Sequence, residues 1–123
     1  MDLPTRFYDA LSLLDRGEYF ECHEVLEELW LEETTSLRLL YQGILQVAVG
    51  CYHLTVRHNR RSGVNKLREG LAKLQTFPAL VGALDLEDLR QQVQALLDRV
   101  QAMRDEEIAS LLPQPLLQVR YRA

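Results

Sequence analysis

Cysteine is scarce in this sequence of 123 residues, which contains only Cys22 and Cys51. Neither belongs to a CxxC pair, the spacing that is typical of zinc and redox sites. Each falls in a predicted helix among mostly apolar neighbours, so we interpret both as reduced, buried thiols. A catalytic or metal-binding role for them is the alternative interpretation.

Positive charge is also in deficit, because 14 Lys and Arg residues stand against 18 Asp and Glu residues and the formal net charge is -4. A protein whose main partner is nucleic acid needs a surplus of positive charge, so we expect no nucleic-acid partner. The charge is uneven: all charged residues from Glu18 to Glu33 are acidic, whereas those from Arg57 to Lys73 are basic except Glu69. We interpret both segments as solvated surface, with a patch for a partner as the alternative.

Long hydrophobic runs that could direct the chain to a membrane are lacking. Positions 1–15 have no uninterrupted apolar core of the kind found in a secretory signal, so we expect a cytoplasmic protein. Residues 39–56 carry no formal charge over 18 positions, which is the length of a membrane span. Polar side chains interrupt this segment and no aromatic belt brackets it, so we predict no membrane span and interpret it as the central helix of a bundle.

The apolar residues that are present recur at helical spacing, and no segment alternates long enough to predict a strand. The predicted fold is all-α, a compact bundle of about five helices built from antiparallel helical hairpins around a long central apolar helix. With 47% hydrophobic residues, we expect a single helical domain over residues 1–112 and a C-terminal tail, 113–123, that is extended or mobile. The expected helices cover about residues 2–17, 18–33, 36–57, 63–75 and 85–103, with one or two further turns up to Leu112.

Local signals predict several ends of these helices. Asp2 is the expected N-cap of the first helix, with Pro4 in its first turn. Asp85 is expected to cap the last long helix, with Asp88 near the positive end of the helix dipole. Residues 78–84, before that cap, are expected to form a hydrophobic loop.

The predicted second helix places two polar residues among its hydrophobic ones. At about 100° per residue, Glu27 lies about 40° from His23, and Trp30 lies about 20° from His23 on the other side. Both polar side chains therefore fall on the apolar face, where burial is costly unless each has a partner. We predict that His23 and Glu27 form a site or an internal network beside Trp30.

The central helix carries a matching polar stripe. Gln42, Gln46 and His53 lie within about 40° of one another, and Gly43 and Gly50 share the stripe. The glycines are expected to let another backbone or a ligand approach closely. Since the second helix is the expected neighbour, we predict a buried network that joins its His and Glu to these polar side chains.

The known catalytic patterns fit this network poorly. The segment that begins at His23 resembles the start of the zinc-peptidase motif HExxH, but Glu27 occupies the position of the second His. A ferritin-like dimetal site needs Glu three residues before His, where this chain has Phe20. A single metal held by His23, Glu27 and His53 is conceivable, but neutral Gln side chains are poor ligands for transition metals. No nucleophile, phosphate loop or oxyanion hole is recognisable, so we predict no catalytic residue and no cofactor.

Three segments together carry a resemblance to a known family: residues 17–30, GEYFECHEVLEELW; residues 40–46, LYQGILQ; and Tyr52-His53. They resemble the prokaryotic domain-of-unknown-function family 309, over about residues 7–74. Cys22 occupies a position where a small residue such as Ala is usual. The resemblance implies a compact all-helical cytoplasmic protein and supplies no reaction, substrate or cofactor.

Two functions are consistent with these observations. The first is a non-enzymatic interaction or scaffold module with a buried His/Glu/Gln network, which meets a protein partner or a second copy. The alternative is a small-ligand or metal-binding protein, an enzyme or a sensor, with its pocket at that network. In a further variant, the Gln and Gly stripe forms a dimer interface. The candidate residues are His23, Glu27, Trp30, Gln42, Gln46 and His53.

Overall fold

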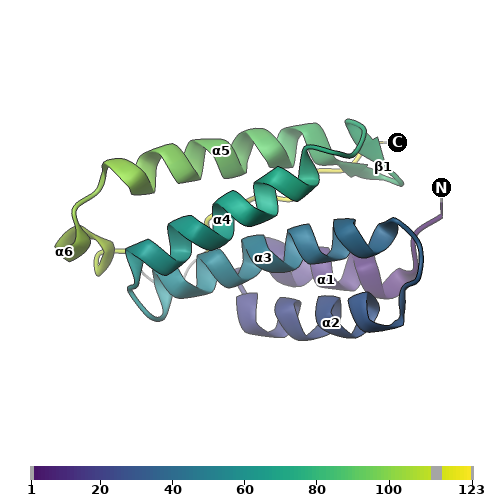
Figure 1. Cartoon of the computed structure of the whole chain (residues 1–123), viewed down its shortest axis with the longest axis horizontal. Helices are drawn as coiled ribbons and strands as arrows, with labels where there is room; N and C mark the ends of the chain where they lie inside the picture. Colours follow the sequence, from purple (N-terminus) through teal and green to yellow (C-terminus); the bar gives the residue numbers. More distant parts are fainter. Residues whose placement is uncertain (1, 112–114, 123) are drawn as a thin grey trace.

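The computed structural model describes residues 2–111 and 115–122, and over these residues the regular secondary structure is almost all helical, as predicted (Figure 1). The one sheet in the described part of the chain has two strands. The elements in chain order are α1 Thr5–Asp15, α2 Tyr19–Glu32, α3 Leu37–Thr55, α4 Arg60–Leu74, β1 Leu80–Val81, β2 Leu84–Asp85, α5 Leu86–Ala102 and α6 Asp105–Ile108. Within this part of the chain, no helix combines the length and the apolar character that crossing a bilayer requires.

The first helix buries the predicted face but begins later than predicted. Phe7, Ala10, Leu11 and Leu14 are its buried residues. Asp2 is not the N-cap, because Pro4 takes that position with an extended backbone and its carbonyl accepts a hydrogen bond from the Phe7 N–H at 2.9 Å. A proline in the extended conformation at the cap, and not inside the first turn, moves the start of α1 to Thr5.

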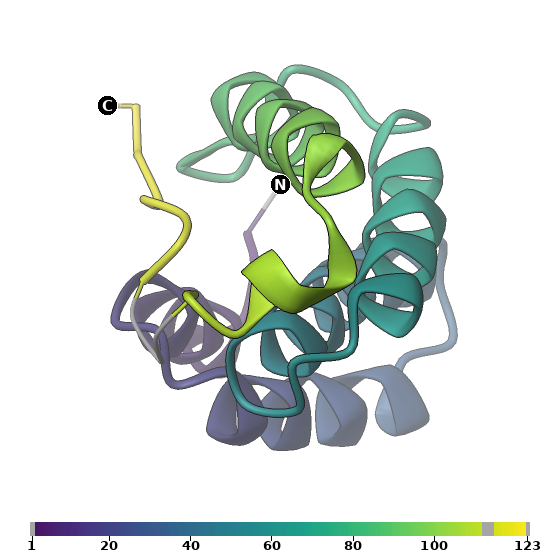
Figure 2. The same cartoon turned by 90° about the vertical axis from the view of Figure 1, so that its left-hand side faces the viewer.

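The central helix α3 lies between α2 and α4 and packs most extensively against α4 (Figures 1 and 2). Glycines of both helices allow this contact, and a Cβ atom built on Gly70 of α4 would lie 2.6 Å from the carbonyl oxygen of Gly43. A Cβ on Gly63 would likewise lie 3.2 Å from the carbonyl oxygen of Gly50. The glycine side of the predicted stripe therefore faces α4. The prediction that α2 would face the glycines is wrong, whereas Gln42 and Gln46 of the same stripe do line a pocket together with residues of α2.

Helix α4 begins at Arg60, three residues before the predicted start at Gly63. Asn59 is the reason, because its side-chain oxygen accepts a hydrogen bond from the Ser62 N–H at 3.1 Å and caps the helix. His58, immediately before the cap, has a positive φ of 52°. The break between α3 and α4 is therefore only four residues long, from Val56 to Asn59.

The segment expected to be a loop contains a small hairpin. Leu80 and Val81 pair antiparallel with Asp85 and Leu84, and Leu84 also forms a bridge with Tyr121. The strands were not predicted because two residues are too few to show an alternating pattern. The predicted cap at Asp85 is confirmed, since its carboxylate accepts a hydrogen bond from the Asp88 N–H at 3.0 Å.

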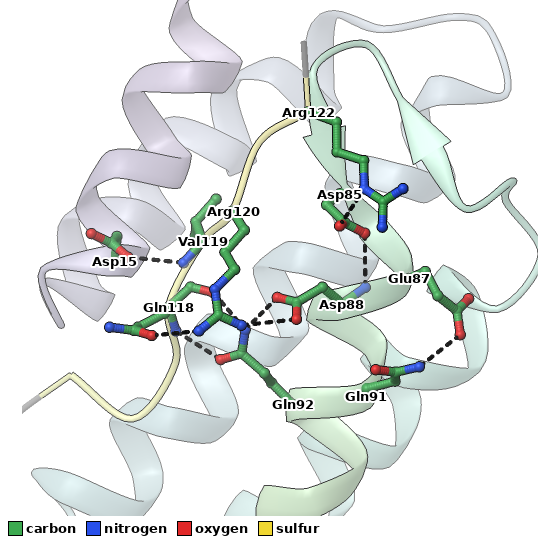
Figure 3. A network of polar contacts seen from close by, with 10 residues as sticks. All are labelled: Asp15, Asp85, Glu87, Asp88, Gln91, Gln92, Gln118, Val119, Arg120 and Arg122. Atoms are coloured by element: carbon green, nitrogen blue, oxygen red, sulfur yellow. Dashed lines mark hydrogen bonds and ion pairs between the residues drawn. The ribbon is translucent and has the colours of Figure 1, made fainter.

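The C-terminal segment, residues 115–122, is extended and runs between α1 and α5 (Figure 2). Gln92 of α5 holds it by two hydrogen bonds, accepting from the Gln118 N–H at 2.8 Å and donating to the Gln118 carbonyl at 2.7 Å (Figure 3). On the opposite side, the Val119 N–H donates to Asp15 of α1 at 2.8 Å. Between α5 and this segment the expected further turns form the separate α6, and Leu112 lies outside the described residues.

Candidate functional site

The predicted burial of His23 and Glu27 is wrong. Their side chains are 30% and 49% exposed, and 3.0 Å separates Nε2 from Oε2, a contact that is an ion pair when His23 is protonated. The buried residues of α2 lie on the adjacent side of the helix, centred about 80° from His23 and about 120° from Glu27. These buried residues are Tyr19, Cys22, Leu26 and Leu29.

The pair instead forms one wall of an open pocket of about 200 Å³ between α2, α3 and α4. The predicted Trp30 belongs to the same wall, and the Arg38 guanidinium covers its ring at 4.4 Å from the centroid. The floor comes from α3 and the far wall from Lys66 of α4. The floor residues are Gln42, Leu45, Gln46 and Val49.

Gln46 is held in place on one side and unpaired on the other. Its Nε2 donates a hydrogen bond to Glu69 Oε2 at 3.2 Å, and the same oxygen accepts from Lys66 Nζ at 3.0 Å. Its Oε1 is buried and accepts no hydrogen bond from any residue in 2–111 or 115–122. A buried acceptor without a partner is unfavourable, and a group that donates to it would be bound more strongly for that reason.

His53 lies in a neighbouring pocket of about 190 Å³, between α2 and the C-terminal half of α3. This pocket is mainly apolar and aromatic. It is lined by Tyr19, Phe20, His23, Val49, Tyr52 and His53. Since His23 and Val49 line both pockets, we call the two together the α2–α3 groove.

The imidazole of His53 is only partly buried, but its Nδ1 is buried and has no hydrogen-bond partner among the described residues. Burial lowers the pKa of His53 below its usual range, and the positive charges of Arg57 and Lys66 lower it further. The neutral imidazole is therefore favoured. Phe20, at the edge of the same pocket, is 50% exposed.

The structure thus brings five of the six predicted residues together in one pocket and places the sixth, His53, in the pocket beside it. Leu45 and Val49 were missed, although both lie within about 100° of Gln46 on α3 and could have been found from that angle. Lys66 carries no such signal, because its position depends on how α4 crosses α3.

The same residues do not form a metal site of the usual kind. Among the described residues, no three His, Cys, Asp or Glu side chains form a group that could hold a metal ion. The two cysteines lie elsewhere and are both free and buried, as predicted. Burial raises the pKa of Cys22 and the pKa of Cys51 to about 12.

Comparison with known proteins identifies relatives without an assigned activity. A family model described as "Domain of unknown function (DUF309)" matches residues 7–67. The "Uncharacterized protein YpuF" of Bacillus subtilis (strain 168) is 33% identical over 93 residues, which are 71% of this chain and 53% of that protein. An "Uncharacterized protein" of Aquifex aeolicus (strain VF5) is 26% identical over 90 residues, 72% of this chain and 27% of that protein. The chain therefore spans about half, or less, of the length of these relatives.

Proposed function

The chain belongs to the DUF309 family through residues 7–67, and for this member we propose a non-enzymatic function in which the α2–α3 groove binds a segment of a partner protein. The observation that carries the proposal is the arrangement of two small pockets in a row along the same pair of helices. A row of pockets suits successive side chains of one peptide segment.

The size of the pockets favours side chains over a whole small molecule. They measure about 200 Å³ and about 190 Å³. Ligand pockets in proteins usually measure roughly 300–1,000 Å³. Each pocket taken alone therefore has the size of a single side chain, and the two together reach only the lower end of that range.

The residues that line the groove indicate which kind of peptide segment would bind there. An apolar side chain fits the pocket between Phe20, Val49 and Tyr52. A hydrogen-bond donor in the next position meets the unpaired Oε1 of Gln46, and a basic side chain meets the half-exposed carboxylate of Glu27. The acidic outer face of α2 would attract the same partner, so the segment is basic and amphipathic.

A small polar ligand in the groove is the second candidate, and it is favoured by the unpaired buried atoms Gln46 Oε1 and His53 Nδ1. Such a ligand could supply donors to both atoms. Native mass spectrometry and elemental analysis of the purified chain distinguish this candidate. A stoichiometric small molecule or metal that is lost in His23→Ala would replace the proposed peptide function.

The proposal can be tested by selecting random short peptides on the immobilised full chain and titrating the selected peptides in solution. Trp30 is the only tryptophan and lies in the groove, so its fluorescence reports occupancy directly. We expect Glu27→Lys to weaken binding at least tenfold. The matched control Glu24→Lys makes the same charge change on an exposed position of α2 outside the groove, and we expect an effect below twofold.

Equal weakening by the two variants would mean that only the net charge matters, and it would refute binding in the groove. Failure to select any peptide with an apolar and a basic residue would do the same. A dimer that dissociates in Glu27→Lys would assign the groove to a second copy of this chain.

A further inference from the structure

A second cavity, of about 620 Å³, lies at the opposite end of α4 from the hairpin and shares no residue with the α2–α3 groove. The α3–α4 turn forms one side, and the end of α5 and the start of α6 close the other, at the same end of the molecule (Figure 1). Its lining is strongly basic. The charged lining residues are Arg57, Arg60, Arg61, Arg68 and Asp105, together with His58, which carries a charge only when protonated.

Most of this positive charge is not neutralised within the molecule. Arg60 forms an ion pair with Asp105, with 2.6 Å between Nε and Oδ1. Asp105 is the only acidic residue in the described lining. Arg57, Arg61 and Arg68 are exposed, and none of the three makes a side-chain hydrogen bond or ion pair that involves another residue in 2–111 or 115–122. Three guanidinium groups are therefore available to an anion.

The helix α4 aligns two of these groups. Arg61, Asn65 and Arg68 follow one another at steps of four and three residues, so their side chains lie within about 60° on one face of α4. Arg57 follows the C-terminal end of α3 and lines the cavity from the same turn. The amides of Asn65 and Gln101 add neutral donors and acceptors.

We propose that this cavity binds a small anion with at least two phosphate groups, of the class of a nucleoside diphosphate. A guanidinium group matches two oxygens of one phosphate, so three unpaired groups exceed the need of a single phosphate. The volume lies in the usual range for small-molecule sites, which is roughly 300–1,000 Å³. It leaves room beside the phosphates for a polar organic part facing the two amides.

Isothermal titration of the full chain with ADP, pyrophosphate and inorganic phosphate tests this proposal. We expect saturable binding of ADP at one site per chain and binding of inorganic phosphate at least tenfold weaker. Pyrophosphate distinguishes the source of the ligand. If it binds as well as ADP, the phosphates alone are recognised, and if it binds more weakly, the nucleoside contributes; both results support the site.

The variant Arg61→Gln/Arg68→Gln removes two of the unpaired groups and should weaken ADP binding at least tenfold. The control Lys73→Gln/Arg99→Gln removes the same charge outside the cavity, and we expect less than a twofold effect. Circular dichroism confirms that both variants are folded. The proposal would be overturned if the two variants had equal effects or if ADP did not bind. It would also be overturned if the chain bound only a short single-stranded oligonucleotide or only vesicles of anionic lipid.

Discussion

Asp85 and Arg122 form an ion pair, with 2.8 Å between Oδ2 and Nε, that joins the start of α5 to the C-terminal segment (Figure 3). The other carboxylate oxygen of Asp85 accepts a hydrogen bond from the Asp88 N–H. That backbone hydrogen bond lowers the pKa of Asp85 below its usual range, and the Arg122 guanidinium lowers it further. One carboxylate thus caps a helix and fixes a segment that is remote in the sequence.

Replacing Asp85 by Asn should reveal this contribution as a pH-dependent loss of stability. Asn can still cap the helix, but it removes the charge that meets Arg122. Because the pKa of Asp85 is lowered in the folded state, its contribution is present above the unfolded pKa of about 3.9 and is lost as the pH falls through the folded value. We therefore expect a lower melting temperature for Asp85→Asn at about pH 7 and convergence with the wild type at a pH below the folded pKa.

The control for that experiment is Asp9→Asn, which removes an exposed carboxylate of α1. It should leave the melting temperature at about pH 7 within roughly 1 °C of the wild type, as expected for an exposed position without a structural role. A deficit of Asp85→Asn that is equally large at both pH values would show that capping, and not charge, is responsible.

The close contact between the glycines of α3 and α4 predicts that adding one methyl group at this contact lowers the stability of the fold strongly. A Cβ on Gly70 would meet the backbone oxygen of Gly43 at 2.6 Å, and backbone cannot move aside. We expect Gly70→Ala to lower the free energy of unfolding in urea by about 2–3 kcal/mol, in spite of the better helix propensity of Ala.

Gly43→Ala is the comparison, because its nearest new contact is the Leu74 side chain, with Cδ2 at 2.9 Å. That flexible side chain can shift, so we expect a loss below about 1 kcal/mol. If the two variants had equal stability, α3 and α4 would not be in backbone contact at Gly70.

Several features of the fold could be predicted because the signal is local. The cap at Asp85 is one, since the carboxylate and the Asp88 N–H are three residues apart. Asn59 and Ser62 have the same spacing, but they lie in the gap between the helices expected over about residues 36–57 and 63–75. The hairpin depends on a remote residue, because Leu84 pairs with Tyr121. No pattern within a short window contains that information.

The predicted residues lie around one groove, but the predicted burial of His23 and Glu27 is wrong. Angles around α2 placed His23 and Glu27 on one stripe correctly. The side of the helix that meets the core depends on the neighbouring helices, and there Cys22 and Leu26 are fully buried. The apolar residues of α2 cover a wide arc, so its sequence does not determine which part of that arc is buried. For this reason the predicted buried network of His23 and Glu27 is instead part of an open groove.

The exposure of the ion pair between His23 and Glu27 predicts that Glu27→Gln is nearly neutral for stability. Pairs of this kind on a helix surface contribute about 0.5 kcal/mol or less. We expect a change in the free energy of unfolding within that limit, measured in urea at about pH 6. A double-mutant cycle with His23→Gln isolates the pair. A coupling energy of about 3 kcal/mol would indicate a buried network and contradict the open groove.

The buried thiols should be unreactive in the folded protein. Thiol reagents attack the thiolate, and burial raises the pKa of both Cys22 and Cys51 to about 12. We expect DTNB at about pH 8 to label native protein only as fast as the chain opens, and to label both thiols at once in guanidinium chloride. Rapid labelling of one thiol in the native protein would identify a reactive cysteine instead.

The imidazole of His53 should titrate below its usual pKa of about 6.5, because burial and the charges of Arg57 and Lys66 disfavour the protonated ring. As the pH falls, His53 of the unfolded chain therefore binds a proton before His53 of the folded protein does. The free energy of unfolding then decreases from about pH 6.5 down to the folded pKa. NMR titration of the His53 ring measures the shift. Arg57→Gln should raise the His53 pKa, whereas the control Arg99→Gln, which removes an exposed charge of α5, should leave it unchanged. A wild-type His53 pKa at or above the usual value would show that the ring is solvated and that the second pocket of the groove is not formed.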